Sequence, residues 1–141
     1  KESQHRWYLI CFDTEKNDFR NFGLDRVLKL DTTTKKFKPL TVDFDAMYQH
    51  AFGVETYEPA EHVVLSFTSY QAQYIKSLPL HASQEILSEE NGRSRFTYFI
   101  HPTNDFIMEL LKHGDSVIVE APNSLRERVK ENITNMMALY Q

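Results

Sequence analysis

The sequence is poor in the residues and runs on which several protein classes depend. Its 141 residues include one cysteine and four glycines. The first count excludes an internal disulfide, and the second leaves too few glycines for a glycine-rich phosphate loop. No apolar run approaches the ~20 residues that span a bilayer, and the polar start at Lys1 does not resemble a secretion signal. We therefore expect a cytoplasmic protein that does not associate with membranes.

Patterns that hold metals or perform catalysis are also missing. The six histidines have neither the short mutual spacing nor the companion cysteines of a metal site. Cys11 lies inside an apolar run and is interpreted as a core residue. The neighbouring acids Glu89 and Glu90 flank a turn, while Asp43 and Asp45 suit the start of a helix. We predict no catalytic residue, no metal and no cofactor, and we do not expect an enzyme.

Charge is divided unevenly along the chain. Residues 1–41 contain nine Lys and Arg against six Asp and Glu, and residues 42–141 contain seven against fourteen. The first part therefore carries a formal charge of +3 and the second −7. An anion-binding surface is expected in the first part, because the second part repels a polyanion. Apolar residues, at 41%, allow one ordinary core and a small second unit.

The N-terminal residues read as short strands. Alternation over residues 6–12 places Arg6 and Tyr8 on one face and Trp7 on the other, where we interpret it as core. The polar run 13–18 predicts a hairpin turn into a second strand, which Gly23 ends with a bend. A third strand is expected over 26–30.

Beyond the proline at position 39 the periodicity changes. Asp43 is expected to cap a short helix that ends before Gly53, and a loop follows to residue 60. Strands are then predicted over 63–67, 83–89, 95–101 and 116–121, and helices over 69–77 and 104–113. Asn91-Gly92 is a strong hairpin signal. A last helix shows capping-box spacing from Ser124 to Glu127 and an apolar stripe that must be covered.

The N-terminal motif resembles a known family. Trp7-Tyr8-Leu9, followed by an arginine, a phenylalanine and then Leu24-Asp25-Arg26, resembles the WYL domain of bacterial transcription regulators. The resemblance implies a small Sm-like or SH3-like β-barrel whose opening strand and helix-turn-helix module would precede Lys1. An edge without a partner is then expected along residues 7–12, to be paired by another chain, covered by the C-terminal unit or left disordered.

The rest of the chain, from about Glu61 onward, resembles the WCX extension of the same regulators. The matching features are the runs 79–84 and 113–115, a proline-threonine before the second helix, and Ala121-Pro122. We predict an α+β protein with three parts: the C-terminal part of a WYL barrel (1–40), a helical connector (41–60) and a WCX unit (61–141). The WCX unit is expected to be ferredoxin-like, βαββαβ, with an additional C-terminal helix.

Ligand-binding residues are expected on the two N-terminal strands. A guanidinium forms charge-assisted bonds with phosphate, and a phenol beside it can stack on a base. The resemblance implies that the basic and aromatic residues of the motif line an effector site, although family patterns often carry another basic residue where this chain has Gly23. The candidates are Tyr8, Arg20, Arg26, Arg6 and His5.

Two functions follow from these interpretations. In the first, the chain senses an anionic nucleotide or a short single-stranded nucleic acid and acts as a homodimer, coupling the effector to promoter DNA through the helix-turn-helix module. In the second, it is a dimerisation or protein-interaction module without a small ligand. If the basic residues converge near Tyr8, the first is favoured; if they scatter, the second is.

Overall fold

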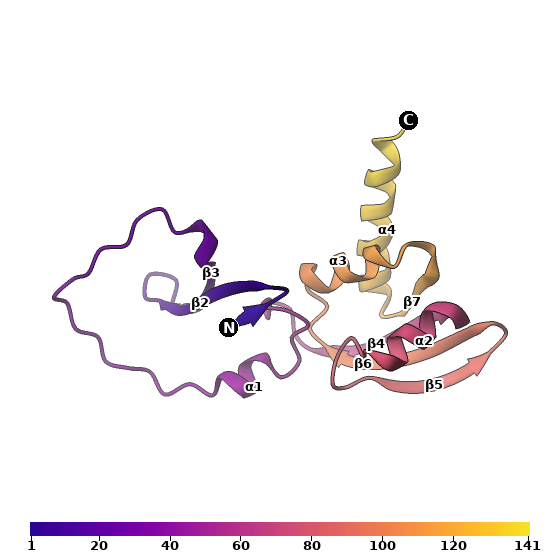
Figure 1. Ribbon diagram of the computed structural model, residues 1–141, viewed down its shortest axis with the longest axis horizontal. Coiled ribbons are helices and arrows are strands. Elements are labelled where there is room, and N and C mark those ends of the chain that lie inside the picture. The colour runs from indigo at the N-terminus through magenta and orange to yellow at the C-terminus, as the bar shows by residue number, and fades with distance from the viewer. The chain divides into compact units, whose positions relative to one another are not determined.

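The computed structural model describes residues 1–141 and divides them into two compact units, Lys1–Met47 and Tyr48–Gln141 (Figure 1). The fold is α+β, as predicted, with one antiparallel sheet in each unit. The division falls within residues 41–60, the predicted connector.

The N-terminal unit contains three antiparallel strands in the order β1-β2-β3. They are β1 (Glu2–Ser3), β2 (Arg6–Asp13) and β3 (Asp18–Gly23). Gln4 and His5 have φ values of 49° and 63°. A two-residue hairpin turn with positive φ at both positions matches the twist of its strands.

Strand β1 was not predicted. It belongs to the same unit and pairs part of the edge that was expected to be paired by another chain, covered by the C-terminal unit or left disordered. Ser3 lies opposite Arg6 and Glu2 opposite Trp7, and the amide of Tyr8 donates to the Lys1 carbonyl at 2.8 Å. The prediction of a third strand over residues 26–30 is wrong. A short 3₁₀ helix, η1 (Leu24–Arg26), follows β3 instead, and residues 27–43 form no strand. Closure of this sheet into a barrel stays a prediction.

One face of this sheet holds a small aromatic cluster. The ring of Phe19 lies edge-on to Phe12 at 5.3 Å between centroids and to Phe44 at 6.2 Å. Phe44 begins α1 (Phe44–Tyr48), and Asp43 caps it as predicted, since its carboxylate accepts from the Ala46 amide at 3.0 Å. Because aromatic edges and faces attract one another, the cluster fixes α1 to this face.

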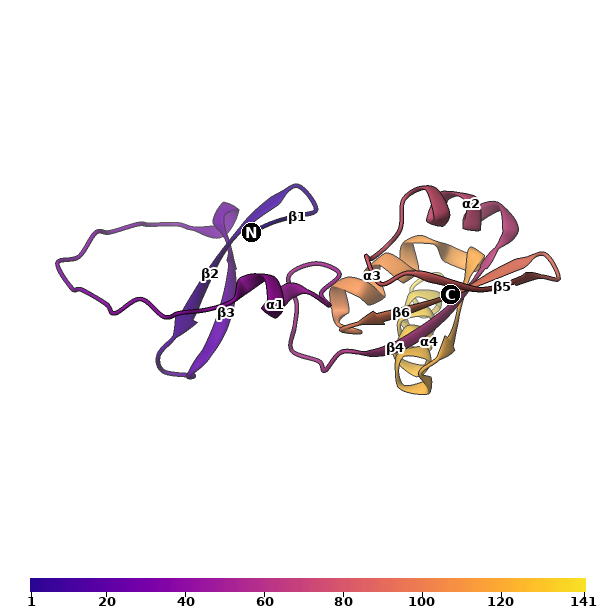
Figure 2. The same cartoon turned by 90° about the horizontal axis from the view of Figure 1, so that it is seen from below.

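The C-terminal unit has the predicted βαββαβ order and an additional helix (Figure 2). Its strands are β4 (Glu61–Thr68), β5 (Glu85–Glu90), β6 (Arg93–Ile100) and β7 (Val117–Ala121), and its helices are α2 (Ser69–Ser77), α3 (Asn104–Lys112), the 3₁₀ turn η2 (Gly114–Ser116) and α4 (Asn123–Ala138). The strands lie in the order β5-β6-β4-β7 and all pair antiparallel. The predicted turn at Asn91-Gly92 is confirmed, with φ values of 52° and 74°.

The core of this unit lies between the sheet and its helices. Alternate residues of the two central strands are fully buried, as the period of a strand requires. They pack against the apolar faces of α2 and α3, and the shared cluster consists of Val63, Leu65, Phe67, Ala72, Ile75, Phe96, Tyr98, Ile100, Phe106, Ile107, Leu110, Val119 and Leu125.

Helix α4 is only partly covered and extends beyond the sheet (Figure 1). Leu125 is buried, whereas Met137 is 59% exposed and Tyr140 89%. A groove of about 430 Å³ lies along the exposed stripe and is walled on the other side by α3 and β7. The predicted capping box is wrong, because the helix begins at Asn123 without a side-chain cap and Ser124 is already inside it.

Two partly buried histidines, His81 and His113, should make the stability of the C-terminal unit depend on pH. Burial lowers the pKa of His81, with a further contribution from the nearby His50 and His101, and burial also lowers the pKa of His113. The unfolded chain, in which histidine titrates near its ordinary pKa of 6.5, therefore binds more protons than the folded unit below that pH. The stability that these two histidines contribute by staying neutral in the folded unit is fully present above about pH 6.5 and decreases as the pH falls below that value. We expect the urea midpoint to be lower at pH 5 than at pH 7.5, and a midpoint that does not fall would contradict this assignment.

Candidate ligand-binding surface

The register of the β2–β3 hairpin decides which candidate residues share a face. Tyr8 lies opposite Gly23, and Cys11 lies opposite Arg20. Residues opposite one another across an antiparallel pair point to the same side of the sheet, and successive residues alternate. Arg20 therefore lies on the face opposite to Tyr8, and the predicted convergence of these two side chains is wrong.

Two of the other candidates, Arg6 and Arg26, do lie on the face of Tyr8. Arg6 has the same parity as Tyr8 in β2, and its guanidinium lies 3.7 Å from the carboxylate of Asp25. A Cβ built on Gly23, the partner of Tyr8, would lie 3.8 Å from the Arg26 side chain. We call Arg6, Tyr8, Asp25 and Arg26 the Tyr8 face. His5 lies in the turn before β2, and its amide donates to the Glu2 carboxylate at 2.8 Å.

The ion pair between Arg6 and Asp25 is open to solvent. The two side chains are 57% and 54% exposed. An exposed pair of this kind contributes little to stability, because water and salt screen it. Either residue can therefore leave this ion pair and bind an external charge at little cost in folding free energy.

Gly23 leaves room for Asp25 rather than permitting a bend. Its φ of −63° is accessible to any residue, so the predicted conformational role is wrong. A Cβ at this position would lie 2.6 Å from the Asp25 carboxylate. The absence of a side chain at Gly23 is thus linked to the position of Asp25, which is the one acidic group on the Tyr8 face.

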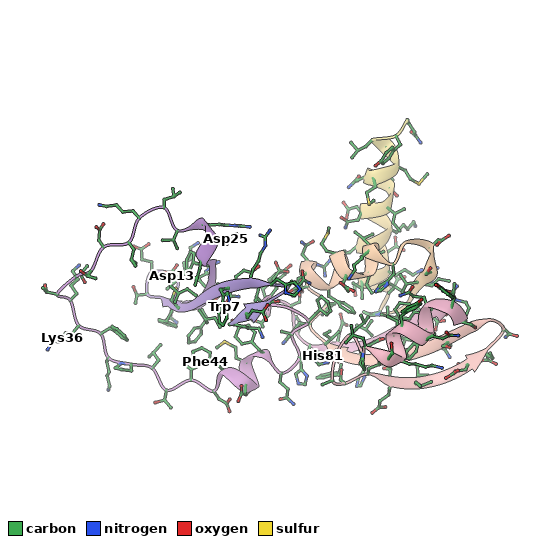
Figure 3. All side chains as sticks on the ribbon, viewed as in Figure 1. Trp7, Asp13, Asp25, Lys36, Phe44 and His81 are labelled. Carbon is green, nitrogen blue, oxygen red and sulfur yellow. The ribbon has the colours of Figure 1, made fainter.

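The opposite face of the hairpin is apolar and exposed. Trp7, which Figure 3 labels on β2, is 63% exposed, Leu9 52% and Phe22 51%. Arg20 is also exposed on this face. Trp7 was predicted to be core, and in this unit it is not. The exposure of Phe22 was missed, although its position opposite Leu9 follows once the register is known.

Lys36, from the lysine-rich segment after η1, does not join the Tyr8 face. Lys36 lies along the extended segment after η1, away from the strands of its unit (Figure 3).

No group of three or more His, Cys, Asp or Glu side chains is placed to hold a metal ion. No helix is long and apolar enough to cross a membrane.

Two family models match the sequence. The model of the WCX domain matches residues 59–137, and the model of the WYL domain matches residues 2–32. Among solved structures, the proteasome accessory factor B/C (PafBC) of Arthrobacter aurescens matches with 24% sequence identity and a TM-score of 0.41. The match covers 88% of this chain and 19% of that chain, so this chain spans about a fifth of its length. No curated protein matches.

Proposed function

Because this chain belongs to the WCX domain family and carries WYL-domain residues ahead of the WCX unit, we propose that it is the ligand-sensing and oligomerising region of a bacterial transcription regulator. The observation that carries the proposal is the Tyr8 face. Two exposed arginines, Arg6 and Arg26, lie there beside the half-buried Tyr8, so this face carries two guanidinium groups and a phenol.

The chemistry of this face fits an anionic effector with an aromatic base. Guanidinium groups bind phosphate through charge-assisted bonds of roughly 1.5–3 kcal/mol each. The ring of Tyr8 is half-buried, which holds it for stacking on a base. A nucleotide or a short single-stranded nucleic acid combines these two features.

An effector controls a regulator only if it binds one state of the protein more tightly than another. The effector must favour one arrangement of the protomers, since equal affinity for two arrangements changes neither population. In this proposal a helix-turn-helix module outside residues 1–141 reads the promoter, and the chain performs no chemistry of its own.

Fluorescence anisotropy with a labelled single-stranded oligonucleotide tests the proposal. We expect saturable binding by the 141-residue chain that weakens as salt increases, since each neutralised phosphate adds about −0.7 to the slope of log K against log salt. An oligonucleotide that does not bind, or that binds without salt dependence, would count against a nucleic-acid effector.

Removing the acid on the Tyr8 face gives a second test. Asp25→Asn frees Arg6 from its ion pair and removes one negative charge. One additional effective charge corresponds to about a fivefold gain in oligonucleotide affinity near 0.1 M salt. The matched control is Asp18→Asn, the same charge change at the first residue of β3, at the far end of the hairpin. Equal gains in both variants would show that only net charge matters.

The exposed stripe of α4 favours the alternative function, an interaction or dimerisation module without a small ligand. Ile133, Met136 and Met137 are each about half exposed along one wall of the groove. Sedimentation equilibrium of the wild type and of Met137→Glu tests it. A dimer that the substitution dissociates supports an interface on α4, and a monomer at all concentrations contradicts it.

A further inference from the structure

The segment between the two family matches is tied to the WCX unit by defined hydrogen bonds. The matches end at residue 32 and resume at residue 59. Within that gap, residues 48–58 belong to the C-terminal unit, and we call them the strap. Beyond the last residue of α1 the strap contains no helix or strand, so its position depends on the bonds it makes.

The central attachment is a reciprocal pair between Glu55 and Asp105. One carboxylate oxygen of Asp105 accepts from the amides of Val54 and Glu55, at 3.0 and 3.2 Å. In return, the amide of Asp105 donates to the carboxylate of Glu55 at 2.9 Å. The hydroxyl of Thr103 donates to the second Asp105 oxygen at 2.5 Å and orients it. Each acid thus binds the amide of the other, as in a capping box, but across a separation of 50 residues.

Two histidines hold the ends of the strap. The Nε2 atom of His81 lies 3.0 Å from the Gln49 carbonyl, and the Nδ1 atom of His101 lies 2.6 Å from the Glu58 carbonyl. Both contacts are to backbone oxygens. Side chains of the strap add to these backbone contacts, since the Tyr57 hydroxyl accepts from the Asn104 amide at 3.0 Å and the Glu58 carboxylate lies 3.8 Å from the Arg128 guanidinium.

The strap contributes almost nothing to the buried core. The fully buried cluster begins at Val63 and ends at Leu125. From the strap only Phe52 packs partly against it, with its ring 5.8 Å from that of Phe106. The ring of His50 also lies 4.8 Å from that of Phe99 on the sheet. Because detaching the strap removes these peripheral contacts but leaves the fully buried cluster intact, it can open at lower cost than unfolding of the unit.

We propose that the strap is a releasable tether, latched to the start of α3 by Glu55 and Asp105. Docked, it shortens the connection between the WYL residues and the WCX core. Released, its eleven residues can extend to roughly 36–40 Å. The latch consists of contacts within the C-terminal unit and does not require the proposed function. Its control by an effector does rest on the proposed function, because the effector must bind the docked and the released forms with unequal affinity.

Amide hydrogen exchange of the full 141-residue chain tests the latch. Asp105→Ala removes the charged acceptor of two strap amides, and exchange over residues 49–58 should become at least about tenfold faster. Exchange in β4 and β6 should not change. Asp115→Asn, which removes an exposed acid outside the strap, should leave both regions as in the wild type.

A second variant covers the case in which Asp105→Ala opens the whole unit. In that case Glu55→Ala tests the latch. It removes only the hydrogen bond that the Glu55 carboxylate accepts from the Asp105 amide, and Glu55 lies outside the buried core. Faster exchange confined to the strap supports the latch. Unchanged strap exchange in Glu55→Ala, or faster exchange throughout the unit, overturns it.

An effector experiment separates failure of the coupling from failure of the proposed function. Adding single-stranded oligothymidine to the wild type should change strap exchange, and anisotropy on the same sample reports whether the probe is bound. Bound probe with unaltered strap exchange contradicts the coupling. An unbound probe contradicts the proposed function, and the two variants alone then decide whether the latch exists.

Discussion

Phe96→Ala should remove most of the stability of the WCX unit, lowering its free energy of unfolding by about 3–5 kcal/mol. Phe96 is fully buried in β6, and its ring lies 5.9 Å from that of Phe67. The substitution loses buried apolar surface and leaves a cavity between sheet and helices. Domains of this size are stable by only about 5–15 kcal/mol. Urea denaturation followed by far-UV circular dichroism measures the loss.

The matched control is the same change at an exposed phenylalanine. Phe37 is 86% exposed, so Phe37→Ala should alter stability by less than about 0.5 kcal/mol. A loss at Phe96 no larger than that at Phe37 would show that β6 does not form the centre of this core.

Arg26→Ala should weaken oligonucleotide binding by about ten- to a hundredfold. A charge-assisted bond to phosphate contributes roughly 1.5–3 kcal/mol, and every 1.4 kcal/mol is tenfold in affinity. Stability should hardly change, because η1 contains no buried residue. Anisotropy titrations at fixed salt measure the affinity, and a urea denaturation curve checks the fold.

Arg20→Ala is the control for this prediction. It removes the same charge from the same hairpin, but on the face opposite to Tyr8. We expect a loss of only a few fold from the reduced long-range attraction. Equal losses at Arg20 and Arg26 would place the effector on neither face in particular, and a larger loss at Arg20 would place it on the face of Trp7 and Phe22.

The C-terminal unit was predictable because its local signals agree with one another. Helix α2 has its predicted bounds, Ser69–Ser77, and the Asn91-Gly92 turn fixes the β5–β6 hairpin. Alternation in β4 matches the buried positions from Val63 to Phe67. When propensity, turn chemistry and periodicity coincide, a single sequence is sufficient.

The N-terminal unit was less predictable because strands depend on partners that sequence does not reveal. Residues 26–30 have the composition of a strand, but no strand pairs with the free edge of β3. A strand without a partner leaves its amides and carbonyls unpaired, so the chain turns into η1 instead. The unpredicted β1 forms because Gln4 and His5 adopt positive φ, which neither residue type signals strongly.

The candidate site failed at Arg20 for a related reason. The face of a residue in the second strand depends on the register of the hairpin, and a slip of one residue moves every side chain to the other face. The polar turn after Asp13 does not specify that register by composition alone. The strap was missed because Asp105 and Glu55 bind backbone amides, and an amide carries no signal in the sequence.

The central claim is that an anionic effector contacts the face of the hairpin that bears Tyr8 and Arg26. Side-chain NMR of the wild-type chain, titrated with a single-stranded oligonucleotide, tests it most directly. We expect shifts of the Arg6 and Arg26 Nε–H signals and of the Tyr8 ring signals, and no shift of the Arg20 Nε–H signal. Shifts confined to Arg20 and Trp7, or saturating oligonucleotide without any shift on the Tyr8 face, would contradict it.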